Sequence, residues 1–367
     1  MMTIGGFWMK KRVFGLDLVR FLAIILVVMV HSFLHSGFND ASVDGLEMYL
    51  LLFCRCLSHC GVLLFILLTG YLNCEKKLDK KYFFSIIPVL TTYLVVSIIT
   101  AITRKFIFHD NVNVFHLVGG IFNFSTIPYG WYVEMYIGLF FFIPFLNILY
   151  KNIPTKKDKQ TFLIILFLFS SFFPTLTKAF IAGHSLNLFP DYWNMLYPFL
   201  LYFMGCYIKE YQITIPKVLN FILIILILFL NSFLLYFYLH GSSISTLLLS
   251  ENYIFSIIQA ILIFLFCYNI KTYSKTLYYS VRFFSKVSFS IYLISYCFDE
   301  FFYNHLHLFY GQTHHYLLCT FLLTPIVFLL SSFAAGIIDY FVKSLFQFFS
   351  KLVDVRRKIT KERHPYD

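Results

Sequence analysis

An arginine and a histidine share one apolar stretch near the amino terminus, "DLVRFLAIILVVMVH" (residues 17–31). Arg20 and His31 are 11 residues apart, which in an α-helix corresponds to about 1100° of rotation and roughly 16 Å of rise. Both side chains are therefore expected on the same face of one helix. Asp17 lies three residues before Arg20, on nearly the same face, where its carboxylate can pair with the guanidinium.

A guanidinium within an apolar helix is costly unless it has a partner or a hydrated cavity. The stripe of Asp17, Arg20 and His31 therefore predicts an internal path, with the arginine toward the cytoplasm and the histidine toward the outside. We expect Arg20 and His31 to share one hydrated interior. The alternative is structural: Asp17 and Arg20 pair to fix helix packing, and His31 lies at the membrane interface.

The composition of the chain indicates an integral membrane protein. Of its 367 residues, 59% are hydrophobic and only 13% are charged, whereas about a quarter of the residues of an average soluble domain are charged. Apolar runs near 20 residues predict an all-α fold of about ten transmembrane helices. The predicted spans are residues 13–35, 46–72, 83–103, 130–150, 161–182, 194–211, 218–239, 252–270, 287–305 and 316–341.

The positions of the basic residues predict the orientation. If the amino terminus is cytoplasmic, the inner segments hold 24 of the 29 Lys and Arg residues. This asymmetry favours cytoplasmic positions for both termini, in the plasma membrane of the cell. It also argues against a nucleic-acid partner, despite the formal charge of +11. We expect a transmembrane domain at 1–342 and a basic cytoplasmic tail at 343–367 that touches anionic membrane lipids.

Further polar residues interrupt the apolar runs. Arg55 and His59 are four residues apart in the second span and share a helical face. Glu134 lies just inside the outer end of the fourth span, and a carboxylate there could pair with Arg55 or His31. Structural pairing is an equally good interpretation of these residues. The eight cysteines show no paired spacing of the kind that binds metal, and no metal site is predicted.

Several segments resemble the acyltransferase-3 family of membrane-bound O-acyltransferases, which act on cell-surface carbohydrates. An Arg, ten residues and a His in the first membrane helix, as in "LDLVRFLAIILVVMVHS", are typical of that family. Four later segments are similar to its motifs in the same order: "GVLLFILLTGYL" (61–72), "YGWYVEMYIGLFFFIPFLN" (129–147), "FLLYFMGCYIKE" (199–210) and "VSFSIYLISYCFD" (287–299).

The resemblance implies specific roles for these residues. The donor would be cytoplasmic acetyl-CoA, bound by Arg20 and by Lys80 and Lys81, which stand where many members carry an Arg-x-x-Arg pair. Lysine is a point charge and lacks the planar fork of arginine, so these donor contacts depart from the family pattern. The plain alternative for the lysines is that they only set the topology.

On the acceptor side, His31 would act as the general base toward a sugar hydroxyl, since its near-neutral pKa suits that role. Asp17 would orient or charge-balance Arg20, and Glu134 is the candidate acceptor-site carboxylate. The substrate-binding candidates are Arg55, His59, Trp131 and Tyr132. Where many members have a second histidine after Ile-Tyr-Leu-Ile, this chain has Ser295.

The leading prediction is a membrane O-acetyltransferase that modifies a cell-surface polysaccharide or a lipid-linked glycan. A transporter or flippase for lipid-linked sugars is the first alternative, because buried charges can also line a transport path. Transporters usually show internal repeats, and none is visible in this sequence. A polysaccharide polymerase is the second alternative. It would be expected to carry a large outer loop rich in arginine, whereas the longest outer segment, 104–129, has only Arg104 and Lys105 beside the membrane.

Overall fold

The computed structural model describes residues 13–110, 113–180, 191–242, 250–312 and 314–363. Within these ranges the regular secondary structure is helical, apart from one isolated bridge between Val43 and His240, and turns and loops join the helices. The helices are α1 (Phe14–His35), α2 (Gly45–Ser58), α3 (Cys60–Asn73), α4 (Lys80–Phe84), α5 (Ile87–Phe106), α6 (Val114–Phe122), α7 (Trp131–Asn152), α8 (Lys156–Phe167), α9 (Phe173–Phe180), α10 (Tyr197–Tyr211), α11 (Lys217–Leu239), α12 (Ile254–Cys267), α13 (Lys275–Asp299), α14 (His315–Leu318) and α15 (Thr324–Arg363).

Seven helical segments of the described chain are long and apolar enough to cross a membrane. The all-helical membrane fold is thereby confirmed. Each of the ten predicted ranges overlaps helical structure, but some contain parts of two helices, as 46–72 does with α2 and α3, and residues 181–182 lie outside the described residues. Helices α10 and α12 have only 15 and 14 residues, and α13 carries more polar residues. The count of ten spans and the side of the termini stay predictions. The boundary predicted at 342/343 falls inside α15, which continues through it as one helix.

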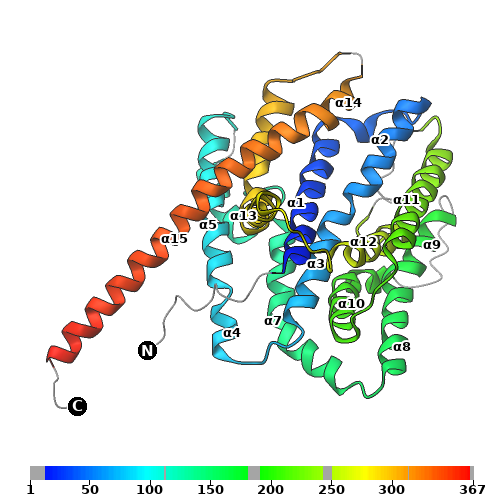
Figure 1. Ribbon diagram of the computed structural model, residues 1–367. Helices are drawn as coiled ribbons and strands as arrows, with labels where there is room; N and C mark the ends of the chain where they lie inside the picture. Colours follow the sequence, from blue (N-terminus) through cyan, green and yellow to red (C-terminus); the bar gives the residue numbers. More distant parts are fainter. Residues whose placement is uncertain (1–12, 111–112, 181–190, 243–249, 313, 364–367) are drawn as a thin grey trace.

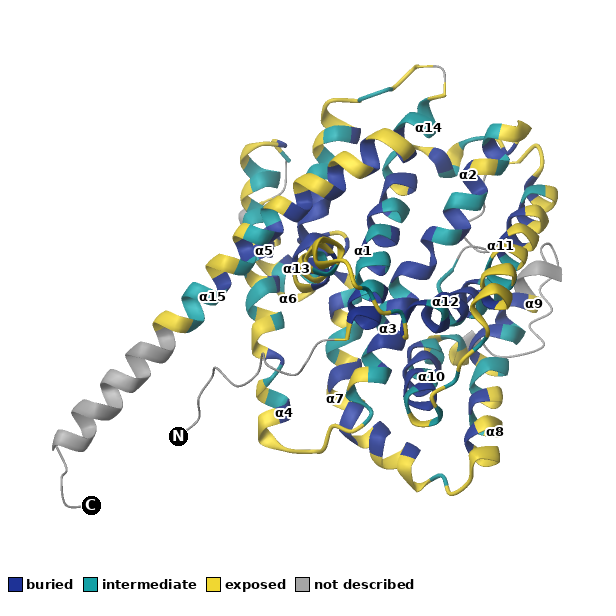
Figure 2. Ribbon diagram, viewed as in Figure 1, coloured by how far each residue is buried: buried dark blue, intermediate teal, exposed yellow. Residues whose placement is uncertain are grey.

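Helix α1 lies in the middle of the bundle, packed against α3 on one side and α13 on the other (Figure 1). Buried residues concentrate in these inner helices, whereas α11 and α15 turn many apolar side chains outward (Figure 2). Within the apolar windows, 61% of α1 is buried but only 28% of α11. Since lipid is as apolar as leucine, exposed apolar side chains on α11 suit a membrane-facing helix.

Two glycines let α3 and α10 cross at very short range. A Cβ atom on Gly70 would lie 2.0 Å from the carbonyl oxygen of Tyr202, and one on Gly205 would lie 2.2 Å from that of Leu67. Small residues of this kind allow the backbones of membrane helices to approach closely. The crossing holds α3, and with it Thr69, in a fixed position beside α1.

Candidate functional site

The amino-terminal end of α1 carries a compact polar cluster. Asp17 is buried, and its Oδ1 lies 3.2 Å from Nη1 of Arg20. The same Arg20 nitrogen donates to Oγ of Ser285 at 3.0 Å, and the Ser285 hydroxyl donates to Asp17 at 2.6 Å. Ser285 comes from α13, so this triangle joins the two helices. The expected pairing of Asp17 with Arg20 is thus present and includes a third residue.

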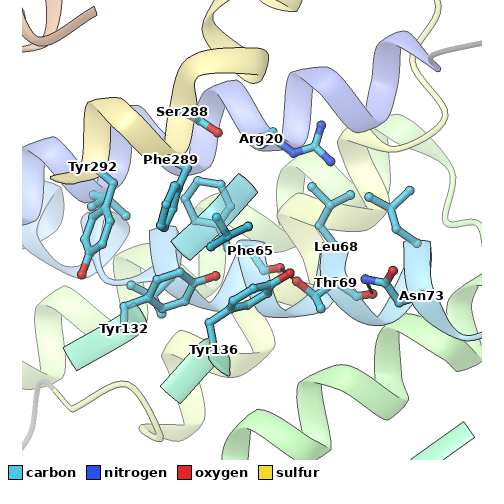
Figure 3. Close-up of a pocket in the computed structure, with 14 residues that line it drawn as sticks. Arg20, Phe65, Leu68, Thr69, Asn73, Tyr132, Tyr136, Ser288, Phe289 and Tyr292 are labelled. Carbon is cyan, nitrogen blue, oxygen red and sulfur yellow. Dashed lines mark hydrogen bonds between the residues drawn. The ribbon is translucent and has the colours of Figure 1, made fainter. Parts of the chain in front are cut away.

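Arg20 also lines a cavity of about 220 Å³ between α1, α3, α7 and α13 (Figure 3). Its wall is mostly apolar, with hydroxyl groups from Thr69, Tyr132, Tyr136 and Ser288. Tyr292 lies at one end of the group of side chains in Figure 3, and Asn73 lies at the other. The whole lining is Arg20, Val27, Val62, Phe65, Leu68, Thr69, Leu72, Asn73, Val89, Tyr132, Tyr136, Ser288, Phe289 and Tyr292.

His31 lies on the same helix but outside this lining. Its imidazole is buried and stacks on Tyr129, with the ring centroids 3.5 Å apart and the planes at 20°. The ring of Tyr292 is 6.2 Å from His31, and the Tyr292 hydroxyl donates to the backbone carbonyl of Tyr129. Tyr129 and Tyr292 thus form an aromatic partition beside His31. The expectation that Arg20 and His31 share one cavity is not confirmed.

One ring nitrogen of His31 lacks a hydrogen-bond partner among the described residues. Nδ1 is buried and makes no hydrogen bond to any part of the chain that the structure describes. A buried polar atom without a partner is costly and calls for an explanation. A ring nitrogen that is held in place by stacking, yet unoccupied by protein donors, can exchange a proton with a substrate group.

Arg55 and His59 lie together where α2 gives way to α3. Both are buried, and the guanidinium of Arg55 is 5.8 Å from the ring centroid of Phe33. Arg55 Nε and Nη1 and His59 Nε2 have no hydrogen-bond partner among the described residues. Neither residue lines the cavity at Arg20. The predicted shared position is therefore found, and a contact of these residues with substrate stays a prediction.

The structure separates the remaining candidates. Glu134 is exposed in the first turn of α7. In the described part of the chain it forms no ion pair with Arg55 or His31. The nearby Tyr132 turns into the cavity (Figure 3), whereas Trp131 is 39% exposed and does not line it. The expected pairing of Glu134 is not found, because Glu134 follows Tyr132 by two residues, about 200° around the helix, and therefore faces outward where Tyr132 faces the cavity.

Lys80 and Lys81 are both exposed at the start of α4, and neither lines the cavity. Asp79 caps the amino terminus of this short helix, because its carboxylate accepts a hydrogen bond from the backbone amide of Tyr82. The two ammonium groups are free to meet a solvent-borne anion, while Tyr82 anchors α4 through its bond to the Phe140 carbonyl. No group of three or more His, Cys, Asp or Glu residues is placed to hold a metal ion within the described ranges.

A second cavity, of about 250 Å³, opens at the carboxyl-terminal end of α1, around His35. The Tyr129 hydroxyl lies 2.7 Å from His35 Nε2 and donates to Asp299 at 2.8 Å. The sequence alone did not indicate a role for Asp299, Tyr129 or Ser285. The signal for Tyr129 and Tyr292 was that both lie inside the family-like segments quoted above, but the excess of aromatic residues concealed it.

Comparison with known proteins identifies the family. The acyltransferase-3 family model, described as an acyltransferase domain, matches residues 13–338. Neither the curated proteins nor the solved structures that were compared include a match. The matched range covers nearly the whole chain, including both cavities and the residues between them. The chain therefore belongs to the acyltransferase-3 family.

Proposed function

We propose that this multi-pass membrane acyltransferase transfers an acetyl group from cytoplasmic acetyl-CoA to a hydroxyl of a cell-surface polysaccharide or lipid-linked glycan. The observation that supports this most is the position of His31, between a cavity that reaches Arg20 and a cavity at the other end of α1. An enzyme that joins an inner donor to an outer acceptor requires such a layout. The proposal includes ten spans, both termini in the cytoplasm and location in the plasma membrane.

The donor would enter from the side of Arg20. Lys80 and Lys81 are exposed and offer positive charge to the phosphates of acetyl-CoA, and the Arg20 guanidinium offers more at the cavity itself. The mostly apolar wall suits the extended thiol arm of the donor, and the hydroxyls of Thr69 and Tyr136 can bond its amides. The thioester would then lie near Tyr292, which must swing aside for the acyl carbon to reach His31.

The proposed chemistry is direct transfer. His31 removes the proton from the acceptor hydroxyl as its oxygen attacks the thioester carbonyl, which forms a tetrahedral intermediate. The carbon–sulfur bond then breaks, and His31 returns the proton to the departing thiolate of CoA. Atoms and charges balance without a further reactant. General-base assistance of this kind typically contributes about 10²–10⁴-fold in rate.

The test is transfer of labelled acetyl groups in sealed membrane vesicles whose cytoplasmic face is outward. Labelled acetyl-CoA is added outside, and label is measured in the glycan fraction. His31→Ala should insert normally and lose transfer, whereas the exposed His116→Ala should keep it. Retained transfer by His31→Ala would remove the general-base assignment. No transfer by the wild-type chain to any glycan of its own cell would remove the proposed function.

A further inference from the structure

The cavity around His35 is lined almost entirely by groups that can form hydrogen bonds or stack on a ring. It is formed by His35, Ser36, Gly37, Tyr303, Asn304, His307, Leu308, Tyr310 and His315. No lysine, arginine or carboxylate is in this lining. Its volume of about 250 Å³ lies below the ~300–1,000 Å³ of sites for drug-sized ligands. The cavity is therefore suited to one small, polar and uncharged ring.

The hydrogen bonds of His35 fix its tautomer. Tyr129 has one hydroxyl hydrogen and donates it to Oδ2 of Asp299 at 2.8 Å. At 2.7 Å from His35 Nε2, the Tyr129 oxygen must therefore accept, so Nε2 carries the hydrogen. Nδ1 is then the acceptor of the ring. The series of hydrogen bonds from His35 through Tyr129 ends at Asp299, which is fully buried.

The acceptor nitrogen of His35 is only weakly engaged. The side-chain amide nitrogen of Asn304 lies 3.3 Å from His35 Nδ1. This Asn304 nitrogen also donates a shorter hydrogen bond, of 2.8 Å, to the Glu300 carboxylate. Asn304 is exposed and lines the cavity. Because a hydroxyl donor prefers about 2.7–2.8 Å, a ligand hydroxyl can replace this long contact at little cost.

We infer that this cavity binds one neutral sugar ring of the acceptor, and that Nδ1 of His35 accepts a hydrogen bond from one of its hydroxyls. Tyr303 and Tyr310 line the cavity, and aromatic rings such as these can stack on the C–H side of a sugar ring. Asn304 and His307 offer further polar contacts. Asp299 and Tyr129 act as positioning residues, because they hold His35 in the tautomer that accepts.

This inference rests on the proposed function, and it names the substrate class of the same site. His31 and His35 are four residues apart and share a helix face, about 6 Å apart along the axis. The ring of Tyr129 stacks on His31 while its hydroxyl holds His35. In the proposed arrangement, a sugar bound at His35 presents a neighbouring hydroxyl toward His31.

The first experiment measures steady-state transfer with Tyr129→Phe, which keeps the ring stacked on His31 but removes the hydroxyl. The acceptor KM should rise about tenfold and the acetyl-CoA KM should stay unchanged; His35→Ala should raise the acceptor KM further. Tyr93→Phe is the matched control, since its buried hydroxyl bonds the Ile121 carbonyl away from this cavity. If Tyr129→Phe and His35→Ala are both active and both keep the wild-type acceptor KM, the inference is overturned.

A second readout does not depend on activity. The purified chain is treated with diethyl pyrocarbonate, and modification of each histidine is read by mass spectrometry. Methyl glucoside or methyl N-acetylglucosaminide should protect His35 and leave the exposed His116 unprotected. Protection without transfer would retain the sugar site and remove the proposed function. Transfer without protection by either glycoside, or protection by glucuronate alone, would overturn the assignment of a neutral sugar.

Discussion

The triangle of Asp17, Arg20 and Ser285 makes a quantitative prediction about stability. Three contacts close it: Arg20–Asp17 at 3.2 Å, Arg20–Ser285 at 3.0 Å and Ser285–Asp17 at 2.6 Å. Asp17 and Ser285 are buried, and 23% of the Arg20 side chain is exposed. The cluster is therefore mostly buried and open only through Arg20, which lines the cavity, so water screens its charges only in part.

Ser285→Ala removes two hydrogen bonds to charged groups and leaves the ion pair. Hydrogen bonds of this type contribute about 1.5–3 kcal/mol, and we expect a loss of stability in that range because the remaining partners can adjust. Asp17→Asn keeps an oxygen acceptor but removes the charge opposite Arg20. Breaking a fully buried pair costs about 3–5 kcal/mol; the partial exposure of Arg20 lowers our expectation to about 2–4 kcal/mol.

The assay is thermal unfolding of the purified chain in one detergent, with all variants side by side. Ser288→Ala is the matched control: this buried serine is one turn along α13, and its hydroxyl donates to the Ser285 backbone carbonyl of the same helix. The expected order of stability is wild type and Ser288→Ala, then Ser285→Ala, then Asp17→Asn. If Ser285→Ala and Asp17→Asn unfold with the control, the triangle does not hold α1 to α13.

Three further predictions follow from the same structure. Gly70→Ala should destabilise the chain by about 1–3 kcal/mol in the same unfolding assay, because its Cβ would lie 2.0 Å from the Tyr202 carbonyl oxygen; Gly138→Ala, in open space, should be neutral or slightly stabilising. The Cys206 thiol and, through opposite charge, Lys209 lower the pKa of Cys74 from 9.0 to about 7. Alkylation of Cys74 by a membrane-impermeant maleimide should therefore level off above pH 7, and only from the cytoplasmic face; labelling from outside would reverse the orientation. Arg20→Lys should raise the acetyl-CoA KM about tenfold in vesicles, since lysine cannot reproduce the guanidinium fork; an unchanged KM would make Arg20 purely structural.

Local features of this chain were predictable because they depend on spacing along one helix. The rise and rotation of an α-helix place Asp17 beside Arg20, and the structure has that contact. Apolar runs likewise predicted helical structure, and each predicted range overlaps at least one helix. The sequence did not predict that a helix boundary at His59 divides the second run into α2 and α3, since a mostly apolar sequence continues on both sides of that residue.

Contacts between distant segments were not predictable from one sequence. Ser285 is 265 residues from Arg20, and Asp299 is 170 residues from Tyr129. Spacing rules say nothing about such pairs. For Glu134, the sequence suggested a contact that the structure lacks. Charge complementarity suggested a basic partner, but the rotation of α7 turns the Glu134 carboxylate outward and brings Tyr132 to the cavity. The aromatic partition beside His31 is likewise a product of packing between α1, α13 and the segment before α7.

The central claim is that His31 acts as the general base in the proposed transfer of an acetyl group from an inner donor to an outer glycan hydroxyl. The most direct measurement is the proton NMR spectrum of surface glycan from cells that lack the gene and express either the wild-type chain or His31→Ala at equal membrane levels. The account predicts O-acetyl signals with the wild-type chain and none with His31→Ala. Equal O-acetyl signals from both cell lines would contradict it.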